Sequence, residues 1–206
     1  MNVSEALKNR RSIRVFQNRP VPARLLKKII VAAAEAPSAG NTQPWEVVVA
    51  QGEALETVRA RNEQLYLDGV PARADLPNIF NAGKVTEAWP EILAKRYQDC
   101  GRAVLGALSI ERGDKAGRQA FYRAMHRFFE APVLLLIGFD KRLPEGYAMY
   151  DLGLYSQCLC LEALAEGLGT CIMAAGVFYP DMLRAHLPVP PNLNLGIGIA
   201  LGYPDP

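Results

Sequence analysis

The first half of the chain alternates helical hydrophobic patterns with one short strand pattern. Apolar side chains recur at helical spacing over residues 22–35, which predicts an amphipathic helix that ends before Pro37. Val47 to Val49 form a β-branched run typical of a buried strand, and a weaker helical pattern follows over residues 53–66. Residues 67–86 contain Gly, Pro and Asn without a period, which predicts an irregular loop and a candidate lid over a site.

The second half of the chain is more apolar. Helical patterns over residues 88–108 and 114–129 lead to a continuous apolar run, Val133 to Phe139, which suits a strand buried on both faces. Residues 147–166 are helical in pattern but apolar nearly all round, so we expect the core or a dimer interface to cover this helix. Gly167 follows it at a position that suits a left-handed helix cap.

Three further elements complete the pattern. We expect a strand over residues 170–173, a short helix over 179–186 and a last strand from Leu195 to Leu201. Helices that alternate with apolar strands predict a layered α/β or α+β domain. The length of 206 residues fits one domain, residues 1–206, in which we take 67–130 as a variable lid and helical region.

Composition and charge exclude several classes of protein. With 50% apolar and 21% charged residues, the chain is not disordered, collagenous or a repeat array. The formal net charge of +2 gives no support for a nucleic-acid or membrane partner. The charged N-terminus is unlike a secretory signal, and the longest apolar run, Ala131 to Phe139, is too short to span a bilayer, so we expect a cytoplasmic protein.

The cysteines and histidines indicate neither a metal site nor a side-chain catalyst. Motifs for a P-loop, a zinc protease and a serine hydrolase are absent. His126 and His186 have no nucleophile near them in the sequence, which favours packing or surface roles. The cysteines show no C-x-x-C spacing, so we expect reduced core thiols at Cys100, Cys158, Cys160 and Cys171.

A basic segment follows a short predicted N-terminal helix around Glu5 to Leu7. In Arg10-Arg11-Ser12-Ile13-Arg14, the alternation of an extended chain puts Arg10, Ser12 and Arg14 on one side. Guanidinium groups offer charged, planar forks that match phosphate oxygens, and a hydroxyl adds another donor. Taken alone, the segment allows two interpretations, a phosphate grip and a solvated basic turn.

A polar loop, Ala36 to Trp45, connects the first long predicted helix to the first strand. Gly40 permits close backbone approach, and two prolines restrict the loop. Such a loop suits the polar edge of a planar heterocycle, and the alternative is a well-capped connection with Trp45 in the core. The polar side chains of the loop are Ser38, Asn41, Thr42 and Gln43.

Together these segments resemble the nitroreductase family of FMN-dependent oxidoreductases, and the matching motifs fall in family order along nearly the whole chain. The resemblance implies homodimers in which each subunit is an α+β fold, an α/β sandwich with a mixed, mostly antiparallel sheet flanked by helices. It places FMN at the subunit interface. The motifs are R-R-S-x-R-x-F at Arg10 to Phe16, A-P-S-x-x-N-x-Q-P-W at Ala36 to Trp45, A-P-V at Ala131, G-L-G-T-C at Gly167 to Cys171 and G-Y-P-D at Gly202 to Asp205.

The resemblance also implies which residues bind the flavin. The phosphate and ribityl chain would be held by Arg10, Ser12 and Arg14, together with Arg11. The loop residues that would reach the flavin ring, often from the other subunit, are Pro37, Ser38, Asn41 and Gln43. Backbone groups would lie along the ring edge, where an N–H stabilises negative charge, at Met173, Ala174, Ala175 and Gly176.

The implied chemistry is ping-pong oxidoreduction. NADH or NADPH passes a hydride to the flavin and leaves, and a planar, electron-poor acceptor such as a nitroaromatic or a quinone takes its place. No catalytic side chain is required, because the cofactor carries the difficult step. Family members usually continue past G-Y-P-D with a tail that adds an Arg or Lys to the phosphate and wraps the partner. This sequence stops at Pro206, so either the given sequence is truncated or the tail is absent, and in the second case we expect flavin affinity and dimer stability to lack that contact.

Two other functions stay open at this point. One is a same-fold flavoenzyme that uses reduced FMN for dehalogenation, ene reduction or flavin breakdown, with the lid, residues 67–100, deciding the substrate. In a deiodinating relative, lid residues hold a zwitterionic amino acid. The candidates for that role here are Glu87, Lys95 and Tyr97, and the competing interpretation gives them ordinary roles on a helix surface. The other is a flavin-binding module without turnover. A third function, nucleic-acid binding through the basic segment, has little support, because no basic surface interleaved with aromatic residues accompanies that segment.

Overall fold

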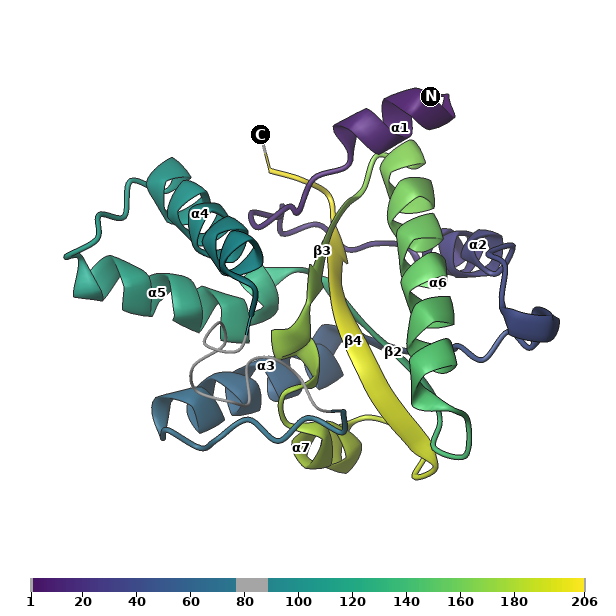
Figure 1. The fold of residues 1–206 in the computed structure, drawn as a ribbon. Helices are drawn as coiled ribbons and strands as arrows, with labels where there is room; N and C mark the ends of the chain where they lie inside the picture. Colours follow the sequence, from purple (N-terminus) through teal and green to yellow (C-terminus); the bar gives the residue numbers. More distant parts are fainter. Residues whose placement is uncertain (1, 77–88, 206) are drawn as a thin grey trace.

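Four strands form one sheet among the residues that the computed structural model describes, 2–76 and 89–205 (Figure 1). Every pairing between these strands is antiparallel. The one parallel pairing in the described part is an isolated bridge between Ser12 and Thr170, outside the pairings of the four strands. In spatial order the strands are β1 (Glu46–Gln51), β2 (Val133–Asp140), β4 (Leu193–Gly202) and β3 (Gly169–Met173).

The helices follow the predicted pattern closely. Those of two turns or more are α1 (Val3–Asn9), α2 (Ala23–Ala33), α3 (Gly52–Leu67), α4 (Glu91–Ala107), α5 (Lys115–His126), α6 (Glu145–Ala165) and α7 (Pro180–His186). Shorter 3₁₀ turns are η1 (Ala39–Asn41), η2 (Phe128–Glu130) and η3 (Ala174–Val177). The helix predicted over 114–129 was too long, because α5 ends at His126 and the chain then takes positive φ angles from Phe128.

Two helical layers enclose the sheet. Helices α2 and α6 pack on the face to which Leu135 and Ile137 of β2 point, and α3, α5 and α7 lie on the face of Leu134 and Leu136. This alternation is the period of two of a strand. All four side chains are fully buried, and each such burial stabilises the fold by about 1.5–3 kcal/mol. The strand predicted to be buried on both faces is thereby confirmed.

Helix α6 is covered on one side only. Gly167 ends it with a φ of 76°, and the Leu168 N–H donates to the Ala163 carbonyl at 2.8 Å, which confirms the left-handed cap. Tyr147 and Tyr150, near its first turns, remain 70% and 67% exposed. One copy of the chain therefore does not cover this apolar helix.

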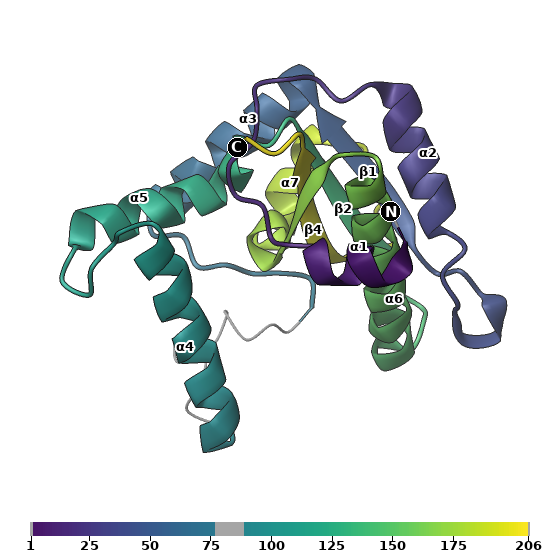
Figure 2. The same ribbon diagram turned by 90° about the horizontal axis from the view of Figure 1, so that it is seen from above.

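Helices α4 and α5 protrude from the rest of the fold. Figure 2 shows α4 pointing away from the sheet, and this helix contains no buried residue. Cys100 lies on it and is exposed, so the prediction of a core thiol was wrong at this position. Within the predicted lid, residues 68–76 are irregular, and 77–88 lie outside the described residues. None of the described helices is long and apolar enough to cross a bilayer.

Candidate functional site

The basic segment runs along the open edge of β3. Helix α1 begins with a capping box between Asn2 and Glu5, and the chain leaves the helix in an extended conformation at Arg10. The Ile13 N–H then donates to the Thr170 carbonyl at 2.9 Å. This bond fixes the register of the segment against β3. Because side chains alternate along an extended chain, it also fixes which of them face the strand.

Arg10, Ser12 and Arg14 gather around the start of β3. All three act on the thiol of Cys171 in β3: burial raises the pKa of this thiol, and Arg14, Ser12 and Arg10 act in the opposite direction. Among the ion pairs of the described residues, none includes Arg10 or Arg14. Neither guanidinium is engaged in an ion pair there, and two guanidinium groups with a hydroxyl are a donor set that suits a phosphate.

Arg11 points elsewhere. Its guanidinium donates to the carbonyl of Lys8 and, at 3.0 Å, to the carbonyl of Arg10, at the C-terminal end of α1. The last carbonyls of a helix have no helical partner and favour a cation. The structure thus gives Arg11 a local capping contact that Arg10 and Arg14 do not have.

The segment from Met173 to Gly176 lies against the sheet where β3 ends. Met173, Ala175 and Gly176 are buried, and Ala174 is half-buried. The turn approaches β4 so closely that a Cβ on Gly176 would stand 2.9 Å from the Cα of Gly198. Glycine at both positions is what permits this approach of one backbone to another.

The polar loop has a strained conformation although it is exposed. Gly40, Asn41 and Gln43 have φ angles of 58°, 55° and 46°, a region that L residues disfavour. Two contacts within the loop hold this shape. The Gln43 N–H donates to Ser38 Oγ at 2.9 Å, and Gln43 Nε2 donates to Asn41 Oδ1 at 3.3 Å. The loop is therefore preformed, with polar groups directed to solvent.

Asp151 anchors this loop from α6. Its side chain is buried, the residue being 3% exposed, and both carboxylate oxygens accept from the Ala39 N–H, at 3.2 and 3.3 Å. None of the ion pairs in the described part of the chain involves Asp151, and its hydrogen-bond partner there is the loop backbone. Asp151 was missed as a candidate from the sequence. The available signal was an acidic residue on an otherwise apolar helix.

Removing this carboxylate is expected to loosen the loop. Asp151→Ala deletes the acceptor of the Ala39 N–H, and losing this hydrogen bond lowers the free energy of unfolding by about 0.5–1.5 kcal/mol. Hydrogen–deuterium exchange should accelerate in peptides covering residues 36–45 and stay unchanged in β2. Glu162→Ala, on the same helix, is the matched control. Unchanged exchange in the Asp151 variant would contradict the anchoring role.

The polar loop lies beside the N-terminal half of α6, whereas the basic segment lies near its C-terminal end (Figure 1). The loop contacts Asp151, whereas the basic segment contacts Thr170, which follows the C-terminal end of the helix. From Asp151 to the end of α6 at Ala165 the helix rises about 21 Å, at roughly 1.5 Å per residue. One copy of the chain therefore does not bring the two groups of predicted flavin-binding residues together.

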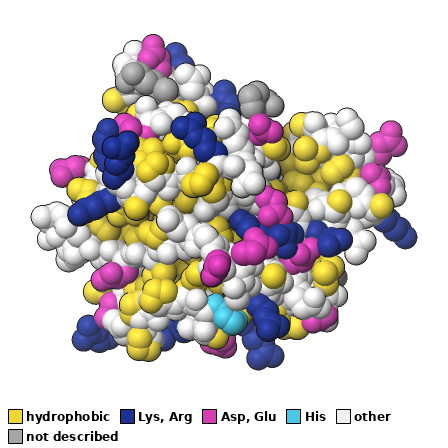
Figure 3. Space-filling view, turned by 180° about the vertical axis from the view of Figure 1, so that it is seen from behind, with side chains coloured by type: hydrophobic (Ala, Val, Ile, Leu, Met, Phe, Trp, Pro, Cys, Tyr) yellow, Lys and Arg dark blue, Asp and Glu magenta, His cyan; other side chains and the backbone are white. Residues whose placement is uncertain are grey.

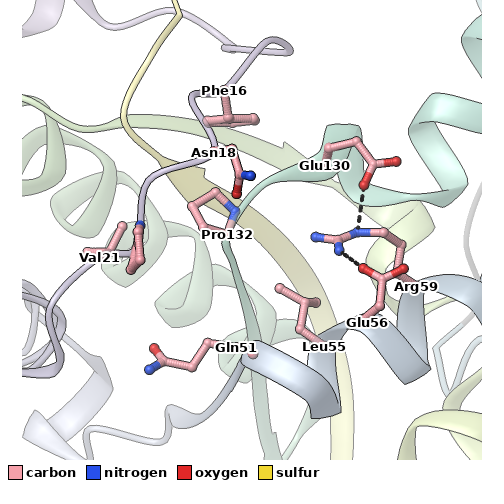
Figure 4. Close-up of a pocket in the computed structure, with 11 residues that line it drawn as sticks. Phe16, Asn18, Val21, Gln51, Leu55, Glu56, Arg59, Glu130 and Pro132 are labelled. Carbon is pink, nitrogen blue, oxygen red and sulfur yellow. Dashed lines mark hydrogen bonds and ion pairs between the residues drawn. The ribbon is translucent and has the colours of Figure 1, made fainter.

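A cavity of about 630 Å³ opens elsewhere, between α3, residues 16–21 and the start of β2 (Figure 4). Leu55 and Pro132 contribute to its apolar wall, and Arg59 with Glu56 and Glu130 forms a charged wall. None of the predicted flavin-binding residues lines it. Its volume falls in the range of ligand sites, but the chemistry that the sequence indicates lies at the edge of β3.

Both histidines occupy structural positions. His126 is buried, its ring stacks on Tyr66 with centroids 4.1 Å apart, and its Nδ1 lies 2.8 Å from the Tyr122 carbonyl oxygen. Burial lowers the pKa of His126, which favours the neutral ring. His186 is exposed in the last turn of α7. These positions are those of packing and surface residues.

The lid residues considered for an amino-acid substrate have ordinary helix contacts. Lys95 pairs with Asp99 at 3.1 Å, one turn along α4. The ring of Tyr97 meets Trp89 edge-on, with centroids 5.7 Å apart. Glu87 lies outside the described residues. No observation on α4 favours an amino-acid site.

Known proteins match this chain along nearly its whole length. The family model described as "Nitroreductase family" matches residues 7–203. A relative from Nocardioides sp. (strain LMS-CY), "4-nitrobenzoate reductase", is 30% identical over 204 residues, which are 97% of this chain and 79% of the relative. "Nitroreductase NfnB" of Mycolicibacterium smegmatis is 33% identical over 199 residues, 97% of this chain and 81% of the relative.

Comparison with solved structures identifies the same group of relatives. The crystal structure of the FMN-dependent nitroreductase NfnB from Mycobacterium smegmatis in complex with NADPH matches with a TM-score of 0.88 and 30% sequence identity. The match covers 98% of this chain and 87% of that one. Sequence and three-dimensional arrangement therefore agree on one set of similar proteins.

Proposed function

This chain belongs to the nitroreductase family, and from that premise we propose that it is an FMN-dependent oxidoreductase that uses NADPH to reduce nitroaromatic compounds. One observation carries the proposal: the chain matches an FMN-dependent nitroreductase solved with NADPH over nearly its full length, in sequence and in fold. The name of the Nocardioides relative points to nitrobenzoate, so 4-nitrobenzoate is the acceptor to test first.

The residues at the edge of β3 fit the phosphate end of FMN. Arg10, Ser12 and Arg14 would hold the phosphate and ribityl chain, a role supported by the effect of all three on Cys171 and by the lack of ion pairs to either arginine within the described residues. Arg11 would contribute less, because its guanidinium caps α1.

The protein's part in the reaction is binding and charge placement. When bound, FMN supplies the redox chemistry between NADPH and the nitro compound. A backbone N–H of the segment Met173 to Gly176, held on the sheet by the contact with Gly198, would stabilise negative charge at the ring edge. We assign no side chain as a general acid or base.

We also propose that two copies assemble and that Pro37, Ser38, Asn41 and Gln43 of one copy reach the flavin of the other. Three features support this: the separation of loop and basic segment along α6, the exposed Tyr147 and Tyr150, and the lack of buried residues on α4. Light scattering after size-exclusion chromatography should give twice the mass of one chain. We propose further that residues 1–206 form one domain and that the protein is cytoplasmic.

The visible absorption spectrum tests the function directly. The purified chain, loaded with FMN under anaerobic conditions, should bleach on addition of NADPH, and 4-nitrobenzoate should restore the flavin bands. If NADPH bleaches the flavin but only acceptors other than nitroaromatic compounds restore its bands, a same-fold flavoenzyme with different chemistry would be favoured. Bound flavin that NADPH does not bleach would favour a flavin-binding module without turnover. The absence of flavin binding would contradict the proposal.

A further inference from the structure

The chain between α5 and β2 makes a left-handed turn. Phe128, Phe129 and Glu130 have φ angles of 54°, 53° and 56°. L residues visit this region as single residues and rarely in succession, because Cβ then crowds the following carbonyl. Phe128 is fully buried and Phe129 is 7% exposed, so the turn is part of the packed structure. Such a conformation persists only where its surroundings impose it.

Arg59 reaches this turn from α3 and binds it at both ends. Its Nε donates to the Arg127 carbonyl at 3.1 Å, and its Nη2 donates to the Ala131 carbonyl at 2.7 Å. The same Nε lies 3.3 Å from a carboxylate oxygen of Glu130. One buried guanidinium thus binds the carbonyl before the turn, the carbonyl after it and a side chain within it. Figure 4 shows Arg59 between Glu130 and Glu56.

The turn determines where the ring of Phe129 lies. The guanidinium of Arg14 stands over this ring, 6.0 Å from its centroid, which is the outer range of a cation–π contact. Reversing the sign of φ at Phe129 would send its side chain to another side of the backbone. A continuous set of contacts therefore leads from Arg59, through the turn and Phe129, to Arg14.

We propose that Arg59 is a positioning residue for the flavin site. It locks the left-handed turn, the turn places Phe129 beneath Arg14, and Phe129 holds the Arg14 guanidinium in place for the phosphate of FMN. The inference rests on the proposed function, because Arg14 has this role only if the chain binds FMN. Arg59 itself does not belong to the predicted flavin-binding residues.

The charges around Arg59 favour this orientation. Burial alone raises the pKa of Glu56, but its contacts with Arg59 and Arg127 outweigh burial and lower the pKa below its usual value. The pKa of Glu63 is lowered in the same way, against burial, by Arg127 and Arg123. These two acids are ionised at neutral pH, so they offset part of the positive charge of the three arginines. Figure 3 shows basic and acidic side chains intermixed on this face, next to the protruding helices.

Comparison of FMN with riboflavin tests the inference. Riboflavin lacks the phosphate, so the ratio of the two dissociation constants isolates the phosphate grip from general damage to the site. Arg59→Met should weaken FMN binding roughly ten-fold, as loss of one charge-assisted contact would, and change riboflavin binding by less than about two-fold. Fluorescence titration of each flavin measures both constants.

Two further variants make the result specific. Arg123→Met is the matched control, because Arg123 pairs with Glu63 in the same network at 2.8 Å, is half exposed and does not touch the turn. It should bind both flavins as wild type does. In the double variant Arg14→Ala/Arg59→Met, FMN binding should be no weaker than in Arg14→Ala alone, since both changes disable the same contact.

Several outcomes would overturn the inference. Equal losses of affinity for FMN and riboflavin in Arg59→Met would make Arg59 a general structural residue. If the ratio of the FMN to the riboflavin dissociation constant rises in Arg14→Ala but stays unchanged in Arg59→Met, Arg59 does not act on the phosphate site. If Arg59→Met does not fold, Arg59→Lys keeps the charge without binding both carbonyls, and it must shift the ratio in the same direction. Wild-type protein that binds neither flavin would overturn the proposed function and this inference with it.

Discussion

Gly198→Ala is expected to lower the free energy of unfolding by about 3 kcal/mol and to weaken FMN binding. The added Cβ would stand 2.8 Å from the Gly176 Cα and 3.3 Å from the Met173 carbonyl oxygen, and both neighbours are backbone atoms. The η3 turn must therefore move away from the sheet, and the segment proposed to line the flavin ring moves with it. The midpoint of thermal unfolding should fall by roughly 6–12 °C, and FMN titration of the folded fraction measures the second effect.

A glycine in open space provides the control. Gly101 lies within α4, and an added Cβ there meets nothing within 4 Å. Alanine favours a helix over glycine by up to about 1 kcal/mol, so Gly101→Ala should unfold at the same temperature as wild type or a higher one. If Gly198→Ala also unfolds at the wild-type temperature, the close approach of η3 to β4 does not constrain the site.

Hydrophobic periodicity predicted those elements whose conformation burial decides. The apolar run of β2 has no polar side to expose, and a strand covered on both faces is the arrangement that buries all of it. Helix α2 was equally clear, because its apolar positions form one stripe. The end of α6 was predicted from a local signal, since glycine adopts the left-handed conformation without a Cβ penalty.

The left-handed turn after α5 has no such local signal. Phe128 to Glu130 contain neither glycine nor asparagine, and their own preferences favour a right-handed helix, which is what the sequence predicted. The conformation depends on Arg59, which is far away in the sequence and reaches the turn from α3. A pattern within one window of the chain does not contain this contact.

The candidate site shows the same division. The basic segment indicated its chemistry, because guanidinium groups at alternate positions suit an anion wherever they lie. Its location against β3 depends on the bond from Ile13 to Thr170, between residues far apart in the chain. Asp151 beneath the polar loop and the pair of Gly176 and Gly198 are likewise contacts across the fold, visible only once the elements have been packed together.

Arg14→Ala is expected to raise the dissociation constant of FMN by about 10- to 100-fold. A charge-assisted hydrogen bond to a phosphate contributes about 1.5–3 kcal/mol, and each 1.4 kcal/mol corresponds to a factor of ten. The fold should survive, because the interactions of Arg14 are a hydrogen bond to the Ser12 carbonyl at 3.2 Å, the contact with Phe129 and an electrostatic effect on Cys171, and none is an ion pair within the described residues. Fluorescence titration with FMN measures the constant, and circular dichroism confirms that the variant is folded.

Arg11→Ala separates a specific contact from general attraction. It removes the same charge three residues away, but its guanidinium is bound to the carbonyls of Lys8 and Arg10 and does not face β3. An effect of net charge alone would weaken FMN binding equally in both variants. A phosphate contact at Arg14 predicts a change of less than about three-fold in Arg11→Ala, the size of a screened surface interaction. Equal FMN affinities in the two variants would show that Arg14 does not hold the phosphate.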